Sequence, residues 1–307
     1  MTVQTTAQVV ERTRWIPDRY RNFEVPSDMV LTVYRVPRPL LDELLELGFP
    51  HRDRDGERWF DVFDLENLTN ALELNAPNWL LMRALGHTYD RDLGRFDDAY
   101  HLQVTARCPD PGHPGDCEFG PGRLLLPAPG EADGLHRTSP GAFVRRVTLP
   151  ADEYHFDDSL LPLFESAARL TFHLIPTDLA GDLGFATETG LADCRLANRL
   201  LLDHARRSAV ECRIASGFVM AAPLPLRHMW IELRVGGHWI AADPFFIGTL
   251  TRWRIISPRD WPLRRSPRRI YWPVTGSPLP EDMALLTHRG ADLRGSARIT
   301  NWRQAQA

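Results

Sequence analysis

The sequence contains no lysine, so its 36 basic residues are all arginine, and codon bias in a GC-rich genome is the simplest explanation. Cysteine is also scarce, since four residues in 307 are too few for a disulfide scaffold. No apolar run approaches the roughly 20 residues that cross a bilayer. The N-terminus lacks the basic start and apolar block of a signal peptide. These absences predict a cytoplasmic protein with no membrane partner.

Positive charge is not in excess either. The net charge of −4 argues against a general nucleic-acid binder, so we expect no nucleic-acid partner. A hydrophobic content of 43% and a charged content of 25% are ordinary for a globular protein. The chain is long enough to bury a substantial core or to form two modest domains.

Changes in composition and periodicity predict five consecutive segments. They are an N-terminal arm (1–28), a small α/β module (29–104), a Pro/Gly-rich loop region (105–150), a catalytic domain (151–275) and a C-terminal extension (276–307). Within the catalytic domain, residues 159–175 and the segment after Asp193 have helical periodicity, and residues 210–221 have the pattern of a strand.

The small module has the element order of a winged-helix-like region. An amphipathic helix over 37–49 is followed by an Asp55–Gly56 turn, a strand over 58–62 and a second helix with Asp64 as its N-cap. Such modules bind DNA or peptides, but the same order occurs in plain structural subdomains, which we favour here. The acidic residues of this region further weaken a DNA-binding interpretation.

The loop region contains three residues of types that ligate zinc: Cys108, His113 and Cys117. Their C-x4-H-x3-C spacing supplies three ligands, and His101 or His136 is available as a fourth. Unligated thiols or a disulfide are the alternatives. The sequence therefore gives only a weak zinc candidate, and we expect no other cofactor.

The clearest hairpin covers "RHMWIELRVGGHWIAADPFF", with two glycines at its turn. If Val235 pairs with His238, then His228 faces Phe245 and Trp230 faces Asp243. Period-two alternation then puts His228 and Asp243 on one sheet face as diagonal neighbours, with Cα atoms about 7–8 Å apart. An aspartate carboxylate reaches an imidazole across that gap.

A cysteine precedes this hairpin in a position that suits a nucleophile. In "TGLADCRLANRLLLDHA", Cys194 lies where a polar turn gives way to a leucine-rich helix. Unpaired N–H groups and the helix dipole stabilise a thiolate there. With His228 as base and acid and Asp243 as orienting carboxylate, the three residue types form a catalytic triad. Cys212 is interpreted as a core thiol, and His204 and His238 are weaker base candidates.

The ordered set "GLADCRLANRLLLDHA", "IASGF", "HMWIEL" and "GGHWIAADP" resembles the transglutaminase-like superfamily, here a bacterial member, over roughly residues 150–250. The resemblance implies a papain-like α+β core in which the cysteine-bearing helix packs on an antiparallel sheet. It also implies thioester chemistry at Cys194. Family members often supply a second oxyanion donor from an upstream Gln, Trp or Tyr, for which Tyr154 is only a distant candidate.

The resemblance implies a cysteine acyltransferase or amidase that forms or cleaves an amide bond in a natural-product pathway. The expected partners are an acyl donor, which a carrier protein or peptide bears, and an amine or water acceptor. An arginine- and aromatic-rich segment suits an anionic partner. The candidate binding residues are Trp230, Arg252, Trp253, Arg254, Arg264 and Arg265. A leader-peptide cysteine protease and an inactive binding scaffold are the alternative functions.

Overall fold

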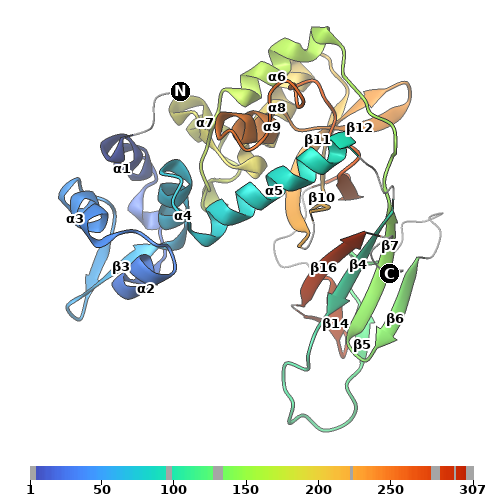
Figure 1. Ribbon diagram of the computed structural model, residues 1–307, viewed down its shortest axis with the longest axis horizontal. Helices are drawn as coiled ribbons and strands as arrows, with labels where there is room; N and C mark the ends of the chain where they lie inside the picture. Colours follow the sequence, from blue (N-terminus) through green and yellow to red (C-terminus); the bar gives the residue numbers. More distant parts are fainter. Residues whose placement is uncertain are drawn as a thin grey trace. The chain divides into compact units, whose positions relative to one another are not determined.

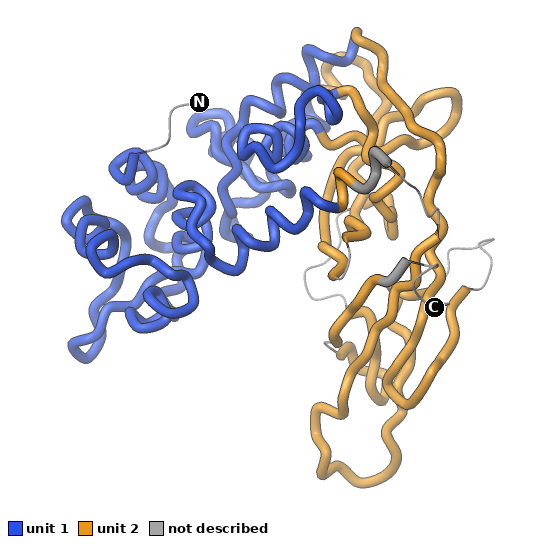
Figure 2. The backbone as a smooth tube through the Cα atoms, viewed as in Figure 1, with its two compact units in different colours: residues 1–87, 159–204, 244–263 blue, residues 88–158, 205–243, 264–307 orange. Residues whose placement is uncertain are grey.

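The computed structural model describes residues 5–94, 99–126, 134–221, 224–277, 284–293 and 295–301. Helices and mainly antiparallel sheets are mixed (Figure 1), which confirms the predicted α+β class. The chain divides into two compact units, coloured separately in Figure 2. Unit 1 comprises residues 1–87, 159–204 and 244–263, and unit 2 comprises residues 88–158, 205–243 and 264–307. The units do not follow the five consecutive segments, because the chain passes between them repeatedly.

Unit 1 is mainly helical. Its first stretch forms α1 (Thr6–Arg14), η1 (Asp18–Tyr20), β1 (Phe23–Pro26), α2 (Ser27–Thr32), α3 (Arg38–Glu46), β2 (Arg52–Arg54), β3 (Glu57–Asp61), α4 (Val62–Ala71) and the start of α5 (Pro77–Gly94). Its later stretches form most of η2 (Asp158–Leu160), then α6 (Leu161–Ala168), β8 (Thr171–Phe172), η3 (Thr177–Leu179), α7 (Leu183–Thr189), β9 (Leu191–Ala192), most of α8 (Cys194–Arg207) and α9 (Pro244–Arg252).

The N-terminal part of unit 1 has the predicted order of helix, hairpin and helix, formed by α3, β2, β3 and α4. A core that includes Phe49, Phe60 and Leu65 holds these elements together. The predicted N-cap was wrong, because β3 ends directly at the helix and Asp61 accepts the hydrogen bond from the backbone N–H of Asp64. Asp64 is instead buried.

Unit 2 consists mainly of strands. They are β4 (Ala99–Thr105), β5 (Phe119–Pro121), β6 (Leu135–Ser139), β7 (Ala142–Thr148), β10 (Cys212–Val219), β11 (Leu226–Val235), β12 (His238–Ala242), β13 (Tyr271–Thr275), β14 (Leu286–His288), β15 (Ala291–Leu293) and β16 (Ser296–Asn301). They form sheets in the orders β12-β11-β10-β13, β16-β4-β7-β6 and β15-β14-β5.

Two expectations about secondary structure were wrong. The region 105–150 is not all loop, because alternating buried residues make β7 a strand that pairs with both β4 and β6. The helix expected over 159–175 ends at Ala168, and Thr171–Phe172 pairs with β9 instead. Apolar residues continue after Ala168, so periodicity alone did not reveal the change from helix to strand.

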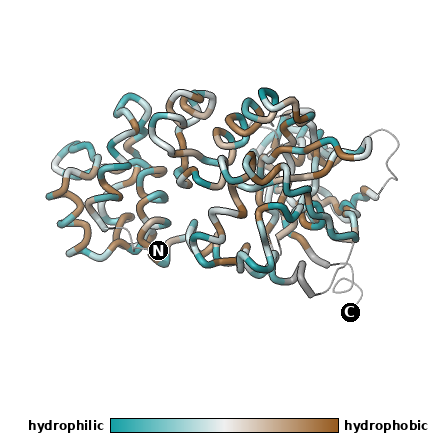
Figure 3. Tube along the Cα trace, turned by 90° about the horizontal axis from the view of Figure 1, so that it is seen from above, coloured by the Kyte–Doolittle hydropathy of each residue, from teal (hydrophilic) through white to brown (hydrophobic). Residues whose placement is uncertain are grey.

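Among the residues that the structure describes, no helix is long and apolar enough to cross a bilayer. Figure 3 shows hydrophilic and hydrophobic residues interspersed along the helices, as expected where one face packs on a core and the other meets water.

Candidate active site

The β11–β12 hairpin has the register that the sequence predicted. Val235 pairs with His238 across the two-glycine turn, and both glycines adopt positive φ angles of 56° and 85°. Strand pairing stops before Asp243, and α9 begins immediately after it. Phe245 therefore lies on the helix and does not face His228. That expectation was wrong because proline after Asp243 has no N–H for a strand ladder and favours a helix start.

His228 and Asp243 meet as predicted. Nε2 of His228 lies 2.5 Å from Oδ2 of Asp243, and the two residues are 7% and 0% exposed. An ionised carboxylate only accepts hydrogen bonds, so Nε2 of His228 is the donor to Asp243. The carboxylate thereby fixes the ring's tautomer and orientation.

Two tyrosines that were not predicted from the sequence extend this pair. The hydroxyl of Tyr271 donates to Oδ2 of Asp243 at 2.7 Å, and the hydroxyl of Tyr89 lies 2.8 Å from that of Tyr271. Burial, followed by the charge of Asp243, raises the pKa of Tyr271 well above its usual value. Tyr271 therefore remains a neutral donor. Only the pairing of β13 with β10 brings it to the site.

Trp230 covers the imidazole. Its ring stacks on that of His228 with centroids 6.2 Å apart and an interplanar angle of 22°, and it also packs against Tyr271. Trp230 was a predicted partner-binding residue, but it is 0% exposed in the structure. In this position it restricts the motion of the His228 ring.

Cys194 lies in unit 1 as the first residue of α8, as the sequence predicted. Gly190 ends α7 with a left-handed φ of 70° and turns the chain into β9. Strand β9 pairs in parallel with β8 and ends at Ala192, two residues before Cys194. Cys194 is half-buried.

The helix start that carries Cys194 is held by Asp193, whose role sequence reasoning missed. Oδ1 of Asp193 accepts hydrogen bonds from the backbone N–H groups of Arg195 and Leu196, at 2.9 and 3.0 Å. Oδ2 of Asp193 accepts hydrogen bonds from Nε and Nη2 of Arg195, at 2.9 and 2.7 Å. Because this arginine balances the charge of Asp193, the cap adds little net negative potential beside the thiol. An acid just before a helical pattern is the sequence signal for such a cap.

Residues 178–244 match the family model described as the transglutaminase-like superfamily. This part of the chain is similar to members of that superfamily. The matched segment includes Cys194, His228 and Asp243, and it supports a papain-like cysteine enzyme. The dyad of His228 and Asp243 lies in unit 2 whereas Cys194 lies in unit 1, so the convergence of all three remains a prediction.

Other comparisons add little to the transglutaminase-like match. No curated protein matches the sequence. A solved structure named "a Putative Cysteine Protease from Cytophaga hutchinsonii" has 11% identity and a TM-score of 0.32, and the similarity covers 68% of this chain and 87% of that one. So loose a likeness does not carry residues from one structure to the other.

Three of the predicted partner-binding residues line a pocket of about 340 Å³ within unit 1: Arg252, Trp253 and Arg254. The guanidinium of Arg252 donates to the carbonyls of Ala168 and Leu170, where α6 ends, and burial lowers its pKa. Trp253 packs edge-on against Trp79 and Phe172. Arg252 therefore holds unit 1 together at this point, and the partner-binding role of the three remains a prediction.

The remaining predicted arginines lie in unit 2. Arg264 is exposed and forms an ion pair with Asp158 at 3.4 Å. Arg265 is only 4% exposed, and its Nη2 lies 3.5 Å from Glu153. A largely buried guanidinium presents little surface to a partner, so of this pair Arg264 is the better placed for a partner contact.

Proposed function

We propose that the protein is a cysteine-dependent acyltransferase or amidase that works through a thioester on Cys194. One observation carries the proposal: the buried His228–Asp243 pair, with Tyr271 donating to the same carboxylate. A purely structural histidine does not need a dedicated carboxylate that is itself fixed by a second donor. The transglutaminase-like match supports the same class of chemistry.

The proposed reaction begins with transfer of the Cys194 thiol proton to Nδ1 of His228, since Nε2 is bonded to Asp243. The thiolate attacks the acyl carbon and the carbonyl electrons move to oxygen. The imidazolium then protonates the leaving group, and a thioester remains. An amine or water gives a proton to Nδ1 as it attacks the thioester, and the thiol leaves with that proton.

The developing oxyanion needs hydrogen-bond donors. The backbone N–H groups of Arg195 and Leu196 already donate hydrogen bonds to Asp193. The proposed oxyanion donor from the helix start is therefore the N–H of Cys194 itself. Tyr154 remains only a distant candidate for the second donor. A carrier-bound or peptidic acyl group of a natural-product pathway is the proposed donor, and this rests on the family resemblance alone.

Alkylation by iodoacetamide tests the proposed triad without a known substrate. We expect Cys194 to be labelled rapidly below about pH 7, and His228→Ala to slow that labelling by about tenfold or more. Cys212, half-buried and with a pKa raised by burial, is the internal comparator. Labelling of Cys194 no faster than Cys212, or unaffected by His228→Ala, would favour an inactive scaffold.

Intact-mass spectrometry then identifies the reaction. The protein is incubated with acyl thioesters, glutamine-containing peptides and leader-type peptides, with Cys194→Ser as the matched control. An acyl adduct on Cys194 that an added amine discharges into a new amide indicates acyl transfer. Discharge by water alone indicates an amidase, and cleavage of the peptide backbone indicates the protease alternative.

A further inference from the structure

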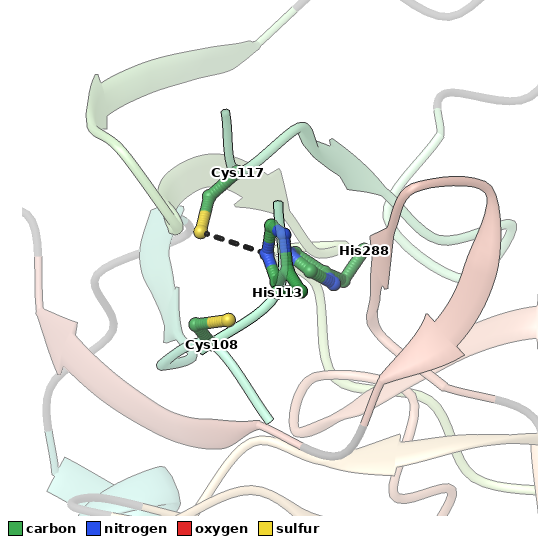
Figure 4. Close-up of side chains that lie close together, drawn as sticks. All are labelled: Cys108, His113, Cys117 and His288. Carbon is green, nitrogen blue, oxygen red and sulfur yellow. Dashed lines mark hydrogen bonds between the residues drawn. The ribbon is translucent and has the colours of Figure 1, made fainter. Parts of the chain in front are cut away.

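A second cluster of reactive side chains lies within unit 2, outside the candidate active site. Cys108, His113, Cys117 and His288 each offer one ligand atom, and the four atoms all lie within 4.8 Å of one another (Figure 4). The first three form the motif that the sequence indicated. The fourth, His288, was not recognised because it lies far along the chain.

The fold explains why His288 is the fourth member. Strand β5 pairs with β14 so that Phe119, two residues after Cys117, lies opposite His288. The tight β14–β15 turn at Arg289 and Gly290 keeps His288 at the end of its strand.

The two histidines proposed from the sequence lie elsewhere in unit 2. His101 belongs to β4 and His136 to β6, and both strands flank β7. Burial, together with the charges of His136 and Arg146, lowers the pKa of His101. The expectation that His101 or His136 supplies the fourth ligand was therefore wrong, and His288 is the fourth member of the cluster.

The geometry within the cluster fits a tetrahedral metal. Zinc–sulfur bonds of about 2.3 Å and zinc–nitrogen bonds of about 2.0–2.1 Å place sulfur and nitrogen ligands about 3.6 Å apart. Sγ of Cys117 lies 3.5 Å from Nε2 of His113. Nδ1 of that ring lies 3.1 Å from the carbonyl oxygen of Pro114 and 3.4 Å from Nη1 of Arg289, so Nε2 is the ring nitrogen on the side of Cys117.

Little of the segment between Cys108 and Phe119 is buried. Residues 109–112 and 114–118 are exposed, so this loop has no apolar core of its own. His288, by contrast, is only 7% exposed, and its Nε2 has no hydrogen-bond partner in the described part of the chain. A ligand that binds all four side chains would anchor the loop to the buried end of β14.

We infer that Cys108, His113, Cys117 and His288 bind one structural zinc ion. Two thiolates and two neutral imidazoles balance the charge of Zn²⁺, and sulfur donors select zinc over magnesium or calcium. Four protein ligands close the coordination sphere, so the metal would stabilise the fold and would not activate water. This inference is independent of the proposed reaction at Cys194.

The test is the metal content of the full chain, purified after expression in zinc-supplemented medium. We expect about one zinc per chain, and loss of it in Cys108→Ser and Cys117→Ser. Cys212→Ser and His136→Ala are the matched controls and should retain the metal. Cys117→His keeps a zinc-ligating side chain at each of the four positions and should also retain the metal. This variant separates loss of a ligand from loss of the fold.

Replacement of zinc by Co²⁺ provides a second measurement on the unaltered chain. Tetrahedral S2N2 coordination should produce intense visible d–d bands and sulfur-to-cobalt charge-transfer bands. A metal-free protein with free thiols at 108 and 117, or with a disulfide between them by intact mass, overturns the inference. Zinc that persists in both serine variants also overturns it.

Discussion

Tyr271 donates its hydroxyl hydrogen bond to Asp243 over 2.7 Å, and the two residues are 1% and 0% exposed. The oxygen that accepts this bond is also the one beside Nε2 of His228. The carboxylate is therefore restrained by two donors from different strands of one sheet. The sequence predicted that Asp243 orients His228. In the structure the orientation of Asp243 itself also depends on Tyr271.

Replacement of Tyr271 by phenylalanine should weaken this arrangement without creating a large cavity. The buried carboxylate loses one donor, so we expect Tyr271→Phe to reduce the free energy of unfolding by about 1–3 kcal/mol. Tyr89→Phe removes the contact between the two hydroxyls and leaves the bond from Tyr271 to Asp243 in place, so it should cost about 0.5–1.5 kcal/mol. Urea denaturation at constant m value measures both, and equal losses would contradict the importance of the bond to Asp243.

Substitutions at Asp193 should separate its cap from its ion pair. Asp193→Asn retains a side-chain oxygen for the N–H groups of Arg195 and Leu196, whereas Asp193→Ala removes it. We expect alanine to be less stable than asparagine by about 1 kcal/mol. Thermal unfolding of both variants measures the difference, and equal Tm values would show that the N-cap contributes nothing.

Gly217 is a position where any side chain should disturb the sheet that holds the dyad. A Cβ there would lie 2.0 Å from the carbonyl oxygen of Trp272, in the strand that carries Tyr271. We expect Gly217→Ala to cost at least about 1–3 kcal/mol. Gly236→Ala is the matched control, because its Cβ meets nothing within 4 Å and only its φ of +56° is strained. Chemical denaturation measures the loss of unfolding free energy in both variants. A smaller loss in Gly217→Ala than in Gly236→Ala would be inconsistent with this packing.

The parts of the site that depend on local pattern could be predicted from the sequence. Two consecutive glycines fix the turn of the hairpin, and alternation then determines which residues of β11 and β12 share a face. The start of α8 at Cys194 follows from the change between turn formers and leucine periodicity. Both features depend on neighbours within a few residues.

The parts that depend on long-range pairing could not be predicted. Tyr271 reaches Asp243 only because β13 joins the sheet beside β10, and His288 reaches Cys117 only because β14 pairs with β5. No short turn joins the two strands of either pair, so no local turn signal indicates that they are neighbours. The contacts of Arg252 with carbonyls of its own unit and the burial of Arg265 were likewise not predictable from the sequence.

The buried His173 should make the stability of unit 1 depend on pH. Burial, and then the charges of Arg12 and Arg21, lower its pKa from 6.5 to about 3. Between these values the unfolded chain binds a proton that the folded chain excludes. The free energy of unfolding should therefore fall as the pH decreases from 6.5 toward 3, and this contribution should vanish above 6.5.

The variant His173→Leu lacks this titration, so the difference in stability between it and the unaltered chain should change steadily in favour of leucine as the pH is lowered. Taking the difference removes the contributions of other titrating groups. His238→Leu, at an exposed position of the hairpin, is the matched control for the loss of a histidine. Denaturant unfolding at several pH values between 7 and 4 provides the measurement. A constant difference for His173→Leu over that range would mean that the folded chain binds the proton as readily as the unfolded one.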